Sequence, residues 1–142
     1  MSVQDILETK GSKVISIGKN DTLREAIGLL NQHNIGVIVV VDDQGNLSGI
    51  LSERDIIRRS LTQETGFRDE KVSKSMTSNV LTIGPDASID DVMEIMTSSR
   101  IRHVPVVEDG RLRGLVSIGD VVKRIIADTE KEIDLLKEYI ST

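Results

Sequence analysis

Apolar residues recur along the chain in one order that occurs twice. In each half, a short apolar run rich in β-branched residues, at residues 14–17 and again at 80–83, ends at a glycine and a polar turn, which predicts a strand. Apolar positions then recur at helical spacing over residues 23–30 and 89–96, which predicts a helix with one buried stripe. Both halves are therefore predicted to open with a strand and a helix.

A hairpin and a second helix complete each half. Residues 37–51 and 104–116 each contain two apolar runs that are too short for helices and are joined by a turn containing Asp and Gly. A helix is predicted to begin after Ser52 and after Ser117. Each half is thus a β-α-β-β-α unit, and the chain is predicted to have an α/β (α+β) fold built from two such repeats.

One signature marks the end of the hairpin in both halves. The sequence Gly-Ile-Leu-Ser-Glu-Arg-Asp from Gly49 to Asp55 recurs as Gly-Leu-Val-Ser-Ile-Gly-Asp from Gly114 to Asp120, 65 residues later (114 − 49). Other parts of the two halves match at an offset of 66 (80 − 14), because Gln44 is an extra residue in the first hairpin turn. The repeat predicts two equivalent sites.

The repeats set the domain organisation that we expect. Residues 1–65 form the first repeat and residues 66–142 the second, and a polar linker at residues 63–74 joins them. The last predicted helix extends beyond the second repeat as an exposed amphipathic helix, which often packs against a partner helix, and we expect a homodimer. Its apolar positions are Val121, Ile125, Ile133, Leu136 and Ile140.

Composition excludes several classes of protein. The chain has 142 residues and no cysteine, which excludes disulfides, thiolate nucleophiles and cysteine-ligated zinc. Its longest apolar stretch, residues 35–41, is far shorter than the ~20 residues of a membrane-spanning helix, so we expect a cytoplasmic protein with no membrane partner. The net charge of −5 argues against a general nucleic-acid binder, which needs a basic surface.

The Ser-x-x-Asp pairs, Ser52 with Asp55 and Ser117 with Asp120, allow two interpretations. Each pair has the spacing of a capping box, which would only stabilise the start of a helix. The recurrence of the same Gly, two apolar residues, Ser and Asp favours a binding site. The free N–H groups at a helix N-terminus favour phosphate, and a carboxylate accepts hydrogen bonds from ribose hydroxyls, so an adenosine ligand would suit both.

The two signatures, together with the sequence Arg-His-Val-Pro-Val-Val at residues 102–107, resemble a tandem pair of cystathionine β-synthase (CBS) domains, the Bateman module. The resemblance covers nearly the whole chain and is to small stand-alone bacterial CBS-pair proteins. It implies a regulatory, energy- or redox-sensing module in signal transduction, with no reaction. The implied ligands are AMP, ADP, ATP, NAD(H) or S-adenosylmethionine, bound in two clefts between pseudo-twofold-related sheets. The signal would pass to an effector protein that the sequence does not identify.

The same resemblance implies roles for particular residues. The Asp of each signature would hold the ribose hydroxyls, the Ser would lie near the ribose or phosphate, and aliphatic residues from the first strand of the opposite repeat would sandwich the adenine. For the first cleft these are Ser52, Arg54, Asp55, Val80 and Leu81, with Arg102 and His103 toward the phosphates. For the second cleft they are Val14, Ile15, Ser117, Gly119 and Asp120.

The two clefts are predicted to differ in charge. The first repeat has Gly36 and Val37 where the second has Arg102 and His103, and a basic pair at this position reaches the ligand held by the other repeat's Asp. The Asp55 cleft is therefore expected to bind the charged ligand, with Arg54 and Arg100 adding to it. The Asp120 cleft, with Gly119 in place of a large residue, is expected to suit a neutral or less charged group.

The residues do not assemble a catalytic set. With no cysteine, two well-separated histidines and no Walker sequence, the chain offers no nucleophile–base pair, so we expect no enzyme activity, no catalytic cofactor and no metal site. The alternative is a ligand-independent dimerisation or scaffold module, because a fold by itself does not define a function. The paired signatures, with Arg102 and His103, favour ligand binding.

Overall fold

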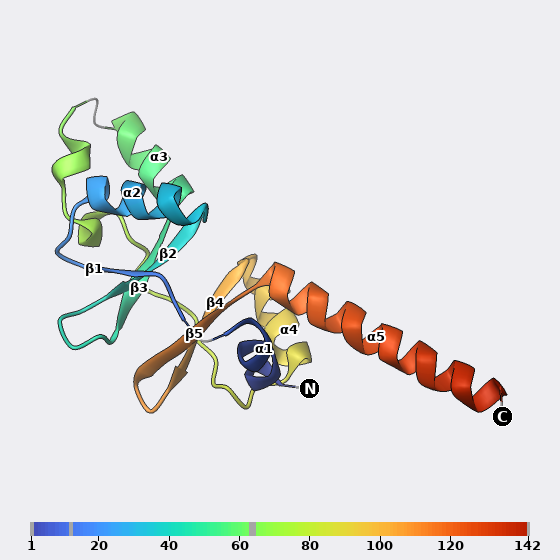
Figure 1. Cartoon of the computed structure of the whole chain (residues 1–142). Coiled ribbons are helices and arrows are strands. Elements are labelled where there is room, and N and C mark those ends of the chain that lie inside the picture. The colour runs from blue at the N-terminus through green and yellow to red at the C-terminus, as the bar shows by residue number, and fades with distance from the viewer. Residues whose placement is uncertain (1, 12, 63–64, 142) are drawn as a thin grey trace.

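The computed structural model describes residues 2–11, 13–62 and 65–141. Figure 1 shows two lobes of helices and strands, one from each half of the chain, and a long C-terminal helix that projects away from both. The described residues form a three-stranded sheet in the first lobe and a two-stranded sheet in the second. The mixed α+β fold is the one that the repeat pattern predicts.

The first lobe follows the predicted order of elements. It contains β1 (Ser16–Gly18), α2 (Leu23–His33), β2 (Val37–Val41), β3 (Leu47–Ser52) and α3 (Glu53–Thr62). The strand β1 pairs in parallel with β2, and β2 pairs antiparallel with β3, so β2 is the central strand of its sheet. The helix α3 begins directly after Ser52, as predicted, and this brings the first signature to the end of the sheet.

The second lobe repeats the arrangement with one strand fewer. It contains α4 (Ile89–Ser99), β4 (His103–Glu108), β5 (Arg111–Ser117) and α5 (Ile118–Ser141), and β4 pairs antiparallel with β5. The prediction of a strand at residues 80–83 is wrong. Within that segment only Ile83 bridges to β4.

A proline in β4 explains the missing strand. In the first lobe, the N–H of Val39 in β2 donates a hydrogen bond to the carbonyl of Ile15, with an N···O distance of 3.4 Å. Ile15 is the residue that precedes β1, so this bond starts the pairing of β1 with β2. The residue that corresponds to Val39 in the second lobe is Pro105, which has no N–H to donate to the corresponding residue, Leu81. The ladder therefore begins only at Ile83, and Leu81 remains half exposed, at 50%.

Each lobe also contains a segment from the other half of the chain, when the halves are divided at residue 65. The helix α1 (Val3–Lys10), which the sequence pattern did not predict, packs with its apolar residues in the core of the second lobe. Its first turn is attached there by the N–H of Val3, which donates to the carbonyl of Ala87 at 2.9 Å. In the other direction, the segment predicted as a polar linker carries two buried residues, Phe67 and Val72, into the core of the first lobe.

The segment between the lobes contains two short 3₁₀ turns, η1 (Phe67–Asp69) and η2 (Val72–Lys74), and residues 63 and 64 lie outside the described residues. The buried Phe67 anchors this segment to the core of the first lobe. An ion pair between Arg59 of α3 and Glu70, at 2.7 Å, holds the same segment to the first lobe. The crossing segments join the two lobes into one module.

The helix α5 leaves most of its length exposed. Val121, in its first turn, is fully buried, whereas the apolar side chains farther along it, such as Ile133 (45%) and Leu136 (61%), are exposed. In the part of the chain that the structure describes, no helix has the length and the hydrophobicity needed to cross a bilayer.

Candidate functional site

Both signatures form complete capping boxes at the junction of a strand and a helix. At the end of β3, the N–H of Ser52 donates to Asp55 Oδ2 at 2.9 Å, and the N–H of Asp55 donates to Ser52 Oγ at 3.2 Å. Ser117 and Asp120 make the same two bonds, at 2.9 and 3.1 Å. A carboxylate has about four acceptor positions, so these bonds leave each Asp able to accept from a ligand as well.

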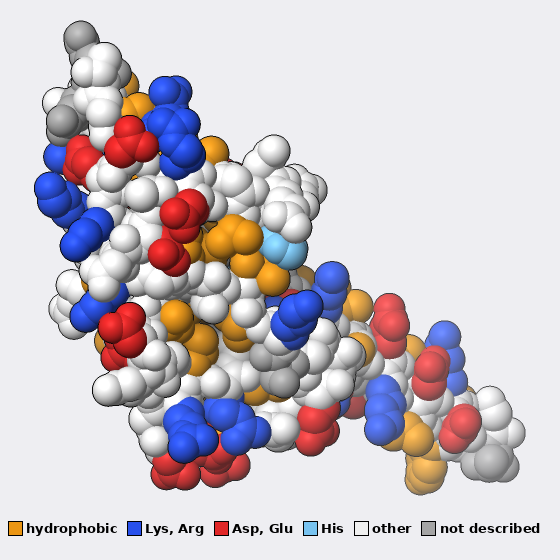
Figure 2. Space-filling model, turned by 60° about the vertical axis from the view of Figure 1, so that its left-hand side comes forward, with side chains coloured by type: hydrophobic (Ala, Val, Ile, Leu, Met, Phe, Trp, Pro, Cys, Tyr) orange, Lys and Arg blue, Asp and Glu red, His pale blue; other side chains and the backbone are white. Residues whose placement is uncertain are grey.

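A cavity of ≈ 850 Å³ lies between the lobes beside the first signature. The first lobe contributes Ser52, Arg54 and Asp55, and the second contributes Val80, Leu81, Arg102 and His103. The structure therefore brings together all the residues that the sequence analysis placed in this cleft. In Figure 2, apolar side chains lie in the hollowed face between the lobes, with acidic and basic side chains around them.

The sequence analysis missed other residues of this cleft. Ile50 and Thr77 line it, and their backbones hydrogen-bond to each other, with N···O distances of 2.9 and 2.8 Å. This bridge holds the segment that follows Thr77 against the first lobe, and it brings Val80 and Leu81 to the cavity. The contact joins residues distant in sequence, and no local pattern indicates it.

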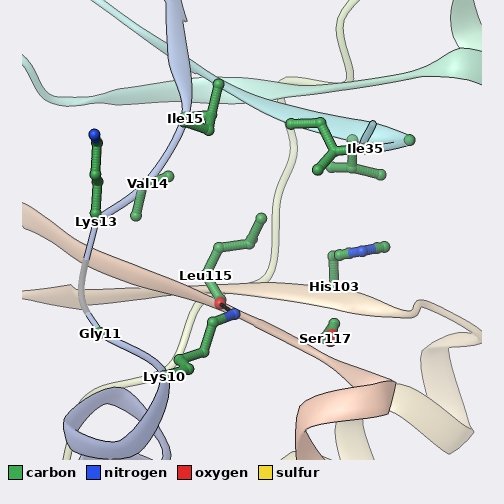
Figure 3. A pocket seen from close by; sticks show the side chains of 11 residues that line it. Lys10, Gly11, Lys13, Val14, Ile15, Ile35, His103, Leu115 and Ser117 are labelled. Carbon is green, nitrogen blue, oxygen red and sulfur yellow. Dashed lines mark hydrogen bonds between the residues drawn. The ribbon is translucent and has the colours of Figure 1, made fainter. Parts of the chain in front are cut away.

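A smaller cavity, of ≈ 350 Å³, lies beside the second signature (Figure 3). Val14, Ile15 and Ser117 line it, as predicted. Gly119 and Asp120, which were predicted for the same cleft, are not among the residues that line it. The carboxylate of Asp120 is instead paired with the ammonium of Lys10, which does line the cavity.

Lys10, the last residue of α1, is the main feature of this cleft that the sequence did not predict. Its Nζ lies 2.7 Å from Asp120 Oδ2 and donates a second hydrogen bond to the carbonyl of Leu115 at 2.9 Å. Figure 3 shows the end of the Lys10 side chain at the carbonyl of Leu115, below the cavity. Burial alone would raise the pKa of Asp120, but the hydrogen bonds from Lys10 and Ser117 outweigh it and lower that pKa below its ordinary value.

His103 lies between the two sites and lines both cavities. Burial lowers its pKa below the ordinary value of 6.5, and the nearby charges of Lys10 and Arg102 lower it further, while Asp120 opposes them. The imidazole is therefore mainly neutral at pH 7. It donates or accepts one hydrogen bond at each ring nitrogen, and an anion placed beside it would favour its protonation.

The two carboxylates differ in their surroundings. Among the ion pairs of the described residues, Asp120 pairs with Lys10, whereas Asp55 takes part in none. The guanidinium groups near Asp55 belong to Arg54, Arg100 and Arg102, which line the cavity. In the Asp55 cleft the carboxylate is thus not paired with the arginines that line the cavity. In the Asp120 cleft the carboxylate already forms an ion pair with Lys10.

Comparison with known proteins identifies the repeats. The CBS domain matches residues 3–62 and again residues 70–127. The chain belongs to the CBS domain family. It is similar to the "CBS domain-containing protein CBSX3, mitochondrial" of Arabidopsis thaliana, with 34% identity over 98% of this chain and 71% of the relative. The resemblance that the paired signatures indicated is confirmed.

Solved structures of other CBS pairs have the same fold. The CBS-domain containing protein ATU1752 from Agrobacterium tumefaciens is 44% identical, with a TM-score of 0.80 over 86% of this chain and 91% of that one. The CBS domain pair of protein MJ0100, in complex with methylthioadenosine and S-adenosyl-L-methionine, is 32% identical, with a TM-score of 0.76 over 88% of this chain and 99% of that one. Family and fold together show a CBS pair, which is a regulatory, ligand-binding type of module.

Proposed function

We propose that this CBS pair is a regulatory module that binds an adenosine ligand in the clefts between its lobes and passes the resulting change to an effector protein. The observation that carries the proposal is the ≈ 850 Å³ cavity, in which Ser52 and Asp55 of one lobe face Val80 and Leu81 of the other. A carboxylate for a ribose, aliphatic side chains for a base and arginines for a phosphate thus line one space.

Each part of such a ligand has a partner of suitable chemistry. Asp55 accepts from the ribose hydroxyls, and these bonds to a charged acceptor contribute about 1.5–3 kcal/mol. The adenine lies against Val80 and Leu81, where the 50% exposed Leu81 side chain loses contact with water. Arg102 and Arg100 face the phosphate, with the N-terminus of α3 and Arg54 on the other side. AMP, ADP, ATP, NAD(H) and S-adenosylmethionine all contain the adenosine that these contacts recognise.

The proposal requires binding and release without turnover. It is supported by a structural neighbour that is itself a CBS pair in complex with two adenosine compounds. We place no catalytic residue, catalytic cofactor or metal in it, and we propose that the protein acts in the cytoplasm as a homodimer. The exposed apolar positions of α5, Ile133, Leu136 and Ile140, support self-association, because exposed apolar side chains on one helix lose contact with water when two copies pair.

The rival to ligand binding is a scaffold that dimerises and binds no nucleotide. Thermal unfolding of the full chain against AMP, ADP, ATP, NAD+, NADH, S-adenosylmethionine and adenosine separates the two. A ligand that binds only the folded protein raises the midpoint of unfolding, and the stabilisation grows with the logarithm of the ligand concentration once this exceeds Kd. GMP at equal concentration serves as the control for base recognition. A panel with no shift at millimolar concentration would overturn the proposal and favour the scaffold.

A further inference from the structure

The two lobes use different groups at one equivalent position beside their sites. In the first lobe, the carbonyl of Ile50 accepts a hydrogen bond from the backbone N–H of Thr77, at 2.8 Å. In the second lobe, the corresponding carbonyl belongs to Leu115, and it accepts from the ammonium of Lys10, at 2.9 Å. A neutral N–H in one lobe is thus replaced by a cation in the other, and that cation also reaches Asp120.

This ion pair disfavours an uncharged ligand at Asp120. Asp120 Oδ2 already accepts from Lys10 Nζ at 2.7 Å and from the N–H of Ser117 at 2.9 Å. The side chain of Asp120 is only 18% exposed, so the pair is partly removed from water. A ribose hydroxyl is a neutral donor and makes a weaker bond than an ammonium does. Lys10 lines the cavity and Asp120 does not, so a ribose that reaches this carboxylate from the cavity takes the place of Lys10 and leaves the ammonium without its charged partner.

An anionic ligand compensates for the loss of the ion pair between Lys10 and Asp120. The cavity beside Ser117 is lined by the basic side chains Lys10, Lys13 and His103 and, among the described residues, by no Asp or Glu. A phosphate in this cavity accepts from Lys10 in place of Asp120, and the Asp120 carboxylate then accepts from the ribose hydroxyls. The side chain of Lys10 is 38% exposed, which leaves it room to turn toward the ligand.

We propose that Lys10 determines the specificity of the Asp120 cleft, so that this cleft accepts adenosine ligands that carry a phosphate or another anionic group and rejects uncharged nucleosides. The inference rests on the proposed function of the clefts. The sequence analysis instead expected this cleft to suit a less charged group. It did not include Lys10, because Lys10 and Asp120 are 110 residues apart in the chain and only the fold brings them together. The Asp55 cleft, whose carboxylate takes part in none of the ion pairs among the described residues, accepts both kinds of ligand.

The test measures one cleft at a time. In the full chain carrying Asp55→Ala, which weakens binding in the other cleft, calorimetric titration gives the affinities of the Asp120 cleft for AMP and for adenosine. Adding Lys10→Met should strengthen adenosine binding and lower the ratio of AMP to adenosine affinity roughly tenfold or more, the loss expected for one charge-assisted hydrogen bond. Lys10→Arg should keep the ratio. Lys74→Met is the matched control, because Lys74 is an exposed lysine of η2 that lines neither cavity, and it should leave the affinities for both compounds unchanged.

The outcomes separate this inference from the proposed function. If the unsubstituted chain binds AMP but Lys10→Met leaves the ratio unchanged, the inference is wrong and the proposed function stands. If Asp55→Ala abolishes binding of AMP as well as of adenosine, the Asp120 cleft is not a phosphate-selective site and the inference is again wrong. If the unsubstituted chain binds neither compound, the proposed function fails and the inference fails with it. Should Asp55→Ala not fold, Asp55→Asn, which keeps a capping acceptor, takes its place in every comparison.

Discussion

The Cα of Gly49 faces the backbone carbonyl of Thr77 so closely that a β-carbon at position 49 would lie 2.5 Å from that oxygen. The same segment is held by the paired backbone bonds between Ile50 and Thr77. The glycine of the first signature therefore permits the approach that brings Val80 and Leu81 into the cleft. At the second signature, a β-carbon on Gly114 would instead meet the Leu7 side chain at 2.6 Å, and a side chain can move aside more easily than backbone.

Gly49→Ala should destabilise the fold by about 1–3 kcal/mol, because the backbone of Thr77 must move away. Gly28→Ala is the control. Gly28 lies within α2 and its β-carbon would meet nothing within 4 Å, so alanine there should stabilise by roughly 0.5–1 kcal/mol. Chemical denaturation measures both. Equal stability of Gly49→Ala and the unsubstituted chain would show that the bridge to Thr77 is not maintained in solution.

Asp55→Ala should weaken binding of adenosine ligands by about 1.5–3 kcal/mol, because the ribose loses a charged acceptor. It should also lower stability by about 0.5–2 kcal/mol, because the capping bond to Ser52 is lost. Asp91→Ala separates the two effects. Asp91 makes the same capping box with Ser88, on an exposed surface of α4, so its loss should lower stability alone. Calorimetry and thermal unfolding on the same samples make the comparison, and equal ligand affinity in both variants would leave Asp55 with a capping role only.

Replacing both Arg102 and His103 by Gln should remove most of the preference of the Asp55 cleft for AMP over adenosine, because the charge-assisted bonds to the phosphate are lost. The measurement uses an Asp120→Ala background, in which the Asp55 cleft is the remaining site. Adenosine affinity should stay close to its original value. A variant that keeps the original ratio of affinities would place the phosphate elsewhere, at Arg54 or at the N-terminus of α3.

The lowered pKa of His103 should make the free protein less stable in mild acid. Below pH 6.5 the imidazole of His103 binds a proton in the unfolded chain but stays neutral in the folded protein. The free energy of unfolding therefore decreases as the pH falls from about 6.5 to the pKa of folded His103, and above pH 6.5 this contribution to stability is fully present. The variant His103→Gln should not show this decrease in stability, because glutamine does not titrate. The difference between the two unfolding curves from pH 8 to pH 5 isolates the His103 contribution from that of the other groups, and two parallel curves would contradict it.

The exposed stripe of α5 should hold two copies together. Light scattering should give a mass of twice 15.6 kDa, and Leu136→Asn should shift the equilibrium toward the monomer, because a 61% exposed leucine would otherwise be covered by the partner. Asp134→Asn, an exposed polar position on the same helix, is the matched control and should leave the mass unchanged. A monomer mass over a wide concentration range would exclude self-association.

Local patterns were enough for most of the architecture and for the signature residues of the Asp55 cleft. The β-branched runs, the helical stripes and the 65-residue repeat predict where the helices and hairpins lie, because these depend on side chains that are close in sequence. The spacing of Ser52 and Asp55 likewise predicts the capping box that the structure contains. The family resemblance added Val80, Leu81 and Arg102, and the structure does bring all three to the cavity beside Asp55.

Long-range contacts decided the rest. The strand expected at residues 80–83 is absent because Pro105, in a different element, cannot donate the hydrogen bond that Val39 donates. Lys10 has no recognisable pattern around it, and its role follows only from the packing of α1 on the second lobe, which brings its ammonium to Asp120. The ammonium and the carboxylate are far apart in sequence, so only the tertiary packing determines that they form an ion pair. The sequence by itself therefore predicts two related sites that differ in charge through Arg102 and His103, and the tertiary structure adds the ion pair of Lys10 with Asp120 that no repeat pattern contains.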